Sequence, residues 1–227
     1  MKKILSSLIL AAVVSFSFAQ SSETRQLDSF DEISVAEAIK VKLIPGSTHK
    51  AEVRVDGTDL AYVLTEVRGG KLKIHMSNQQ NRYKNVDVSI EVTYVDLDEI
   101  EVSSAAKLTA VEAVKTQALS IEVTSAGDAR ITVDVESLEA KASSAGEIEV
   151  RGTSKRQTVK CSSAGDYNGY DLQSEMADVD VSSSGDARVF VSEELKAEAS
   201  SGGSVKYRGD PQVVIADSSS GGRVRKG

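Results

Sequence analysis

Apolar and polar residues alternate with a period of two over the second half of the chain. The odd positions from 119 to 133 and the even positions from 138 to 150 hold apolar or small residues, and the positions between them are mostly polar. Successive residues of a strand point to opposite faces, so this pattern predicts short strands with one buried face rather than helices.

The alternation is organised in repeats. The stretch "TSAGDAR" returns as "SSAGEIE", "SSAGDYN", "SSSGDAR", "SSGGSVK" and "SSSGGRV", and the last small residues of the repeats are Ala106, Gly127, Gly146, Gly165, Gly185, Gly203 and Gly222. Their spacings are 21, 19, 19, 20, 18 and 19 residues. A period near twenty is typical of a solenoid whose coils bury their apolar faces by stacking. We therefore predict an all-β chain with a parallel β-helix of about seven coils over residues 97–227.

The same parity makes a prediction for the small residues of each repeat. One serine per repeat falls on the buried parity: Ser104, Ser125, Ser144, Ser163, Ser183, Ser201 and Ser220. We expect these serines to point inward, in a file whose hydroxyl groups pass hydrogen bonds from coil to coil. The glycine that follows is expected to permit a bend and a close approach of the backbone.

Residues 20–96 lack the repeat but are also rich in β-type alternation. They predict strands around a loop at "PGSTHK", a hairpin that turns at Gly69 and Gly70, and a short helix with Thr58 or Asp59 as its N-cap. A further hairpin is expected to join "LKIHM" to "VDVSIEVTYV". This β-rich segment is predicted to cap the N-terminal end of the solenoid, without a flexible linker between them.

The chain begins with "MKKILSSLILAAVVSFSFAQ", in which Lys2 and Lys3 precede an apolar run that closes on Ser17 and Ala19. This pattern predicts a secretory signal peptide over residues 1–19. The mature protein is then exported to the periplasm, the extracellular space or the cell surface, and no membrane insertion is expected after cleavage, because no later stretch reaches the roughly 20 apolar residues of a membrane span.

Charge narrows the range of partners. Without the two lysines of the signal peptide, 25 basic residues face 34 acidic ones, a formal charge of −9. This balance disfavours nucleic acid and anionic membrane surfaces. Glycans and envelope proteins are the candidate partners that stay open, together with a second copy of the chain.

The motifs "FDEISVAEAIKVKLIPG" and "VRGGKLKI", the serial "SSAGD"-type coils and the closing "SGGRVRKG" resemble the DUF2807 family of putative auto-transporter adhesin head GIN domain proteins. The resemblance runs from about residue 27 to the C-terminus. It implies a right-handed parallel β-helix, similar in shape to pectin lyases, and a role in adhesion at the cell envelope. It implies no catalytic residues and supplies no site residues.

The candidate binding residues lie just after the glycines. Asp128, Glu147, Asp166 and Asp186 each follow the glycine directly and would form one outward acidic stripe, with Arg130 and Arg188 two positions further on. Such a stripe could bind a cation or a glycan, or be a solvated turn in which each carboxylate bonds its own backbone. Aromatic residues make up only 4% of the chain, and Tyr170, expected on a turn, is the best candidate for an exposed ring that packs on a sugar.

The residues expected of an enzyme are scarce. His49 and His75 have no Cys or His at metal-ligand spacing, so no metal and no cofactor is predicted. Cys161, the only cysteine, shares the buried parity and is expected to be a small apolar filler. No G-x-S-x-G motif accompanies the serines.

These observations favour an exported, non-enzymatic solenoid that acts as an adhesion or binding module of the cell envelope. One alternative is a carbohydrate-active lyase or hydrolase that uses the acidic stripe. Another is a structural or sensor protein of the envelope.

Overall fold

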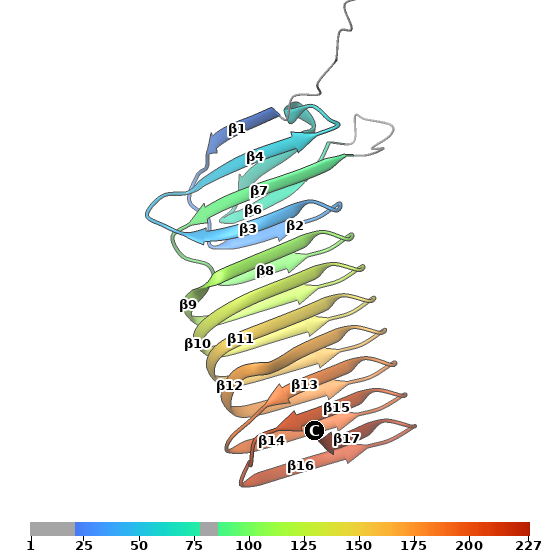
Figure 1. Ribbon diagram of the computed structural model, residues 1–227. Helices are drawn as coiled ribbons and strands as arrows, with labels where there is room; N and C mark the ends of the chain where they lie inside the picture. The colour runs from blue at the N-terminus through green and yellow to red at the C-terminus, as the bar shows by residue number, and fades with distance from the viewer. Residues whose placement is uncertain (1–20, 78–85) are drawn as a thin grey trace, which may run out of the picture.

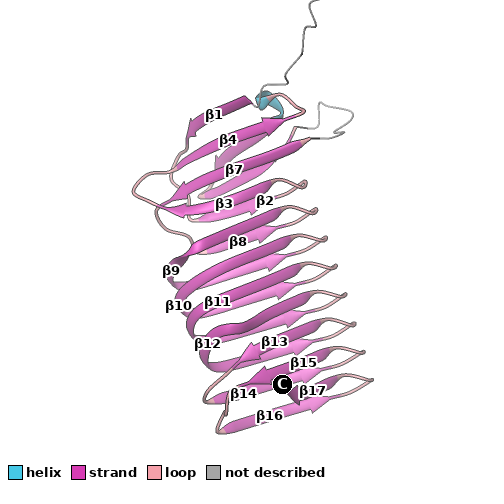
Figure 2. Ribbon diagram, in the orientation of Figure 1, coloured by secondary structure: helices cyan, strands magenta, loops and turns pink. Residues whose placement is uncertain are grey.

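The computed structural model describes residues 21–77 and 86–227 (Figure 1). The predicted signal peptide and most of the connection "SNQQNRYKN" lie outside the described residues. The described chain is almost entirely strand, with one single-turn 3-10 helix, and its coils stack along one axis (Figure 2). No helix among the described residues is long and apolar enough to cross a membrane.

The strands pair into one continuous hydrogen-bonded system. They are β1 (Ser21–Gln26), β2 (Glu32–Val35), β3 (Lys40–Pro45), β4 (Lys50–Asp56), β5 (Val63–Arg68), β6 (Lys71–Met76), β7 (Asp87–Tyr94), β8 (Glu99–Val102), β9 (Lys107–Val123), β10 (Asp128–Ala142), β11 (Glu147–Cys161), β12 (Asp166–Val181), β13 (Asp186–Phe190), β14 (Glu194–Ala199), β15 (Ser204–Arg208), β16 (Val213–Ser218) and β17 (Arg223–Lys226).

Each coil crosses two opposed sheets. A tight turn joins the sheets at one edge, and the long strands β9 to β12 bend around a rounded corner at the other (Figure 1). Neighbouring coils pair in parallel and in register, so that Leu138 of β10 lies between Leu119 of β9 and Gln157 of β11. This pairing confirms the predicted parallel β-solenoid.

The parallel ladder does not begin at residue 97. Strands β2 and β3 already form a coil, which lies between the β6–β7 pair on one side and the β8–β9 pair on the other. Strands β6 and β7 are therefore consecutive strands on opposite sheets, and the predicted hairpin between them is wrong. The alternating pattern gives the faces of a strand but not its neighbour, so it could not separate a hairpin from a coil.

Antiparallel strands close the N-terminal end. Strand β4 pairs antiparallel with β7, β1 pairs antiparallel with β4, and β5 pairs antiparallel with β6. The β5–β6 hairpin turns at Gly69 and Gly70 with positive φ, as predicted. The predicted short helix is the 3-10 turn Leu60–Tyr62, in which the Asp59 side chain accepts a hydrogen bond from the Ala61 backbone.

The repeated turns correct the expected position of the serines. Ser125 and Ala126 are exposed at the tip of a turn, with φ of 50° and 59°, and the Gly127 backbone N–H donates to the Thr124 carbonyl. Positive φ at both central residues defines a type I′ turn. Its two tip residues point outward, and the odd positions are buried again from Gly127 onward, so the strands keep the same parity on both sides of the turn. Backbone groups rather than hydroxyls link these tips: Ala126 donates its N–H to the carbonyl of Ser144 in the next coil.

The glycine of each repeat is buried under the preceding coil. A Cβ at Gly146 would lie 2.3 Å from the Val123 carbonyl oxygen, and a Cβ at Gly165 would lie 2.2 Å from that of Ala142. Neither residue has positive φ. The expected close approach is thus confirmed, whereas the bend lies at the two residues before the glycine.

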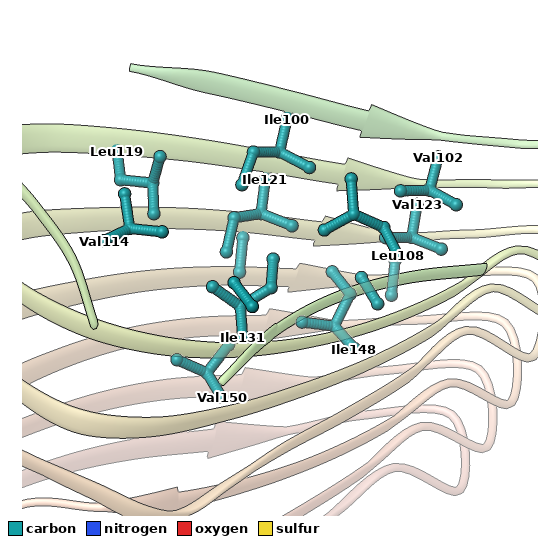
Figure 3. Packing of buried hydrophobic residues seen from close by; sticks show 14 of the residues in the cluster. Ile100, Val102, Leu108, Val114, Leu119, Ile121, Val123, Ile131, Ile148 and Val150 are labelled. Atoms are coloured by element: carbon teal, nitrogen blue, oxygen red, sulfur yellow. The ribbon is translucent and has the colours of Figure 1, made fainter. Parts of the chain in front are cut away.

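The core is a single stack of aliphatic side chains between the two sheets. Ile100 lies over Ile121 and Val102 over Val123, with exposed fractions of at most 1% (Figure 3). Cys161 occupies the same file as Val123 and is buried, as predicted. One core cluster extends from the N-terminal cap into the last coils, which makes the described chain one continuous body.

Candidate functional site

The acidic stripe stands in register on one face. Asp128 pairs with Glu147, Glu147 with Asp166, and Asp166 with Asp186. Lys107 precedes the stripe in the same file. The four carboxylates therefore occupy equivalent positions in four successive coils.

Basic side chains already engage two of these carboxylates. Asp128 forms ion pairs with Arg130 at 3.2 Å and with Lys107 at 3.7 Å, and its side chain is only 14% exposed. Arg188 holds both oxygens of Asp166, at 2.9 and 3.1 Å. The arginines thus compensate part of the negative charge that a bound cation would otherwise neutralise.

Tyr170 was expected on a turn with an exposed ring, but it lies in a strand and one face of its ring is covered. It lies within β12, where the register with β11 shifts between Glu149 and Arg151. The ring is half-buried, and the Arg208 guanidinium carbon lies 3.9 Å from its centroid. One face of the ring is therefore occupied by a cation–π contact.

The residues considered for catalysis are dispersed. The His49 ring packs against the Phe30 ring, with 4.7 Å between the ring centroids. The His75 Nδ1 lies 3.1 Å from the Met76 carbonyl oxygen. Burial, with smaller contributions from the charges of Asp166 and Asp186, raises the pKa of the Cys161 thiol to about 12. Within residues 21–77 and 86–227, no group of three or more His, Cys, Asp or Glu side chains is arranged to hold a metal ion.

A lysine clamp on the other sheet was not predicted. The Lys71 ammonium lies 3.0 Å from Glu32, 2.6 Å from Glu99 and 2.9 Å from Glu101, and so ties β6, β2 and β8 together. Its hydrogen bond to Glu99 opposes and outweighs the effect of burial, so the pKa of Lys71 is raised well above its usual range. The cluster depends on β2 lying between β6 and β8, which the alternation of the sequence does not reveal.

A buried polar network inside the solenoid was also missed. Gln157, fully buried, donates from Nε2 to the Ser174 hydroxyl and to the Phe190 carbonyl, and accepts from the Tyr167 hydroxyl. Ser174 in turn donates to the Phe190 carbonyl at 2.6 Å. A signal was present: Gln157 stands at the apolar position that Leu119 and Leu138 fill in earlier coils.

Several solved structures are similar in fold to the chain. A "putative adhesin" of Bacteroides fragilis NCTC 9343 has a TM-score of 0.83 at 15% identity, over 92% of this chain and 98% of its own. A "putative lipid binding protein" of Parabacteroides distasonis ATCC 8503 has a TM-score of 0.71 at 22% identity, over 92% and 96%. A "putative adhesin" of the same organism has a TM-score of 0.72 at 20% identity, over 92% and 97%.

These structures share the architecture of the chain, and their identities are low enough that the likeness concerns the fold alone. None of the curated proteins compared with the chain matches it. Residues 29–211 match the DUF2807 family, described as "Putative auto-transporter adhesin, head GIN domain", and since this span covers most of the chain, the protein belongs to that family.

Proposed function

We propose that the protein is an exported, non-enzymatic binding module of the cell envelope. Three features support the proposal: membership of the DUF2807 family, the continuous solenoid, and the ion pairs that hold two of the four candidate acids, Asp128 and Asp166. The signal-peptide pattern at residues 1–19 supports export.

The ion pairs of the acidic stripe support the view that the protein is not an enzyme. A general acid or base needs a carboxylate that is free to exchange a proton at the pH of the reaction. Asp128 and Asp166 are instead held by Arg130 and Arg188 within the sheet. Cys161 also lacks the properties of a nucleophile, because its thiol is buried and its pKa is raised.

The rigidity of the scaffold supports the binding part. Coil-to-coil hydrogen bonds run through the strands and through the turn tips, so each outward side chain has a fixed position relative to its equivalent one coil away. A fixed array of equivalent positions limits the conformational entropy lost when an extended ligand binds. Such a surface suits recognition of a repeating or extended partner.

The test is incubation of the purified protein with a panel of plant, host and bacterial polysaccharides, followed by assays for new reducing ends and unsaturated products. Retention of the protein on envelope preparations is measured in parallel. We expect retention without depolymerisation. Depolymerisation that disappears in the double variant Asp128→Asn, Asp166→Asn would contradict the proposal and favour a lyase or hydrolase.

A further inference from the structure

The rounded edge of the solenoid carries a trough opposite the tight turns. In three successive coils the chain passes this edge at residues 134–136, 153–155 and 173–175, and the register stacks the three segments. The middle residues Val135, Ser154 and Ser174 face inward and are at most 7% exposed, whereas the residues on both sides are exposed. Small inward residues between two projecting rows leave a channel along the edge.

A cavity of about 440 Å³ occupies this channel. Its floor includes Ser154 and Ser174, and the partly exposed side chain of Phe190 lines it as well. The floor is held in place from inside, because the Ser154 hydroxyl donates to the Arg156 carbonyl at 2.7 Å and Ser174 belongs to the Gln157 network. The channel is therefore preformed.

A second cavity lies next to this channel, toward the N-terminal end. Lys115 pairs in register with Asp134, and Thr116 pairs with Val135. Lys115 and Thr116 also line the second cavity, which has a volume of about 560 Å³. That cavity is also lined by Asp98, which accepts a hydrogen bond from the Thr116 hydroxyl. The two cavities thus follow one another along the edge, in the direction in which the coils stack.

The residues that line the first cavity carry a net negative charge, which favours neutral over acidic ligands. Around the first cavity, Asp134, Glu136 and Glu175 outnumber Lys155, whose ammonium is paired with Glu136 at 2.5 Å. An excess of carboxylates repels phosphate-rich and uronic-acid-rich polymers. A neutral ligand does not meet this repulsion.

The backbone of the edge argues against a peptide that adds a strand. Ser192 and Glu193 donate their N–H groups to the carbonyls of Ser174 and Glu175 in the preceding coil, at 3.0 and 2.9 Å. The groups that β-augmentation would use are therefore engaged already. What the channel offers instead is side-chain hydroxyl, amide and carboxylate groups beside the ring of Phe190.

Hydroxyl groups of a sugar can donate to carboxylates and to serine and threonine oxygens, whose own protons are already engaged, and accept from the Gln173 amide. The C–H face of a sugar ring packs on an aromatic side chain. We propose that this edge channel binds a linear neutral oligosaccharide, with Phe190 as the surface that contacts a sugar ring. The proposal rests on the proposed function, since it names a ligand class for the binding module.

The test is titration of the purified mature protein, residues 20–227, with neutral gluco-, manno- and galacto-oligosaccharides of two to six units, by calorimetry. Polygalacturonate and phosphatidylcholine vesicles are the acidic and lipid probes. We expect at least one neutral series to bind, more tightly as the chain lengthens from two units to four. Phe190→Leu, which keeps an apolar side chain, is expected to weaken binding about tenfold, which corresponds to about 1.4 kcal/mol.

Two further variants separate the channel from the fold. Thr153→Arg projects a long side chain into the channel from an exposed position and should abolish binding with an unchanged circular dichroism spectrum. Ile215→Ala, an exposed apolar position on β16 and not a lining residue of either cavity, should bind as the parent does. Binding unaffected by Phe190→Leu and Thr153→Arg would overturn the channel.

The remaining outcomes distinguish this inference from the proposed function. Retention on envelope preparations without binding of any neutral oligosaccharide would overturn the channel and leave the binding module standing. Preference for polygalacturonate or vesicles would overturn the neutral-sugar assignment. Depolymerisation of a bound sugar would contradict the proposed function itself.

Discussion

The Tyr167 hydroxyl donates a hydrogen bond of 3.0 Å to the Gln157 side-chain oxygen inside the solenoid, where both residues are fully buried. In register, Tyr167 lies between Ile148 and Ala187. Its ring fits because residue 169 is glycine, where a Cβ would lie 2.7 Å from the ring. A polar pair thus stabilises one coil of an otherwise aliphatic core.

Tyr167→Phe removes the donor to Gln157 and leaves a buried acceptor without its partner. We expect the free energy of unfolding to fall by about 1–2 kcal/mol, measured by urea denaturation. Tyr207→Phe, on a partly buried ring, is the control and should change stability by less than about 0.5 kcal/mol. Equal losses in the two variants would show that the Tyr167 hydrogen bond contributes nothing specific.

Gly146→Ala places a Cβ 2.3 Å from the Val123 carbonyl oxygen. The coils must separate locally, and we expect a loss of about 2–3 kcal/mol. Gly127→Ala is the matched variant: its Cβ would lie 2.8 Å from the Val102 oxygen, and its counterpart in the preceding coil is Ala106. A smaller cost for Gly127→Ala, by thermal denaturation, is expected, and the reverse order would contradict the packing described for these glycines.

Ala145→Gly relieves a strained backbone, because Ala145 is exposed with a φ of 61°. The left-handed conformation costs an alanine more than the extra chain entropy costs a glycine, so stability should rise by about 0.5–1 kcal/mol. The last two turns already have glycine here, at Gly202 and Gly221, both with positive φ. Glu139→Gly, at a partly buried position of β10 outside the left-handed region, should lower stability, and a gain there would refute the strain argument.

Lys71→Gln should change how stability depends on pH. Partial burial favours the neutral form of Glu101, but hydrogen bonds from Lys71 and Ser34 and the charge of Lys71 outweigh it, and the pKa of Glu101 is lowered from its ordinary 4.5. A carboxyl with a lowered folded-state pKa contributes stability above about pH 4.5 that is lost as the pH falls through the folded-state pKa.

The parent should therefore lose stability more steeply than Lys71→Gln as the pH falls below 4.5. At pH 7 the variant should be less stable than the parent by about 1 kcal/mol. Fully exposed ion pairs contribute less than this, but the Lys71 side chain is only 21% exposed, so its pairs are less screened by solvent. Lys40→Gln, whose partner Asp87 is 60% exposed, is the control and should change stability by less than about 0.5 kcal/mol. Parallel stability curves for the parent and Lys71→Gln between pH 3 and 7 would show that Lys71 does not lower the pKa of Glu101.

Much of the fold could be predicted because one rule governs it. Alternation by two identified the buried files, and the spacing of the small residues identified the coils, so residues such as Ile121 and Cys161 were placed correctly. The error at Ser125 arose because the parity of the strands was applied to the tip of a type I′ turn, whose two central residues point outward although the parity resumes at Gly127. The insertion of β2 and β3 between later strands could not be predicted, since local pattern does not determine strand neighbours.

The candidate site was less predictable than the fold. The outward acids could be placed in one file from their spacing, but their pairing with Arg130 and Arg188 depends on side-chain geometry. The edge channel lies where the parity of the buried positions changes, between Ser154 and Gln157 and between Ser174 and Ala177. This change marks the corner, but the alternation does not show that the corner is hollow. The only sequence signal of the buried network was a polar residue, Gln157, at a position where the equivalent residues of earlier coils are leucines.

Distances between turn tips test the stacking of the coils most directly, because every site described here depends on it. Cysteines introduced at Ala105 and Ser184, and separately at Ala105 and Gly221, can carry nitroxide labels for pulsed electron resonance, while the buried Cys161 stays unlabelled. The first pair spans four coils and the second six, so we predict separations of about 19 and 29 Å. Equal separations, or a second distance shorter than the first, would contradict the stacked solenoid.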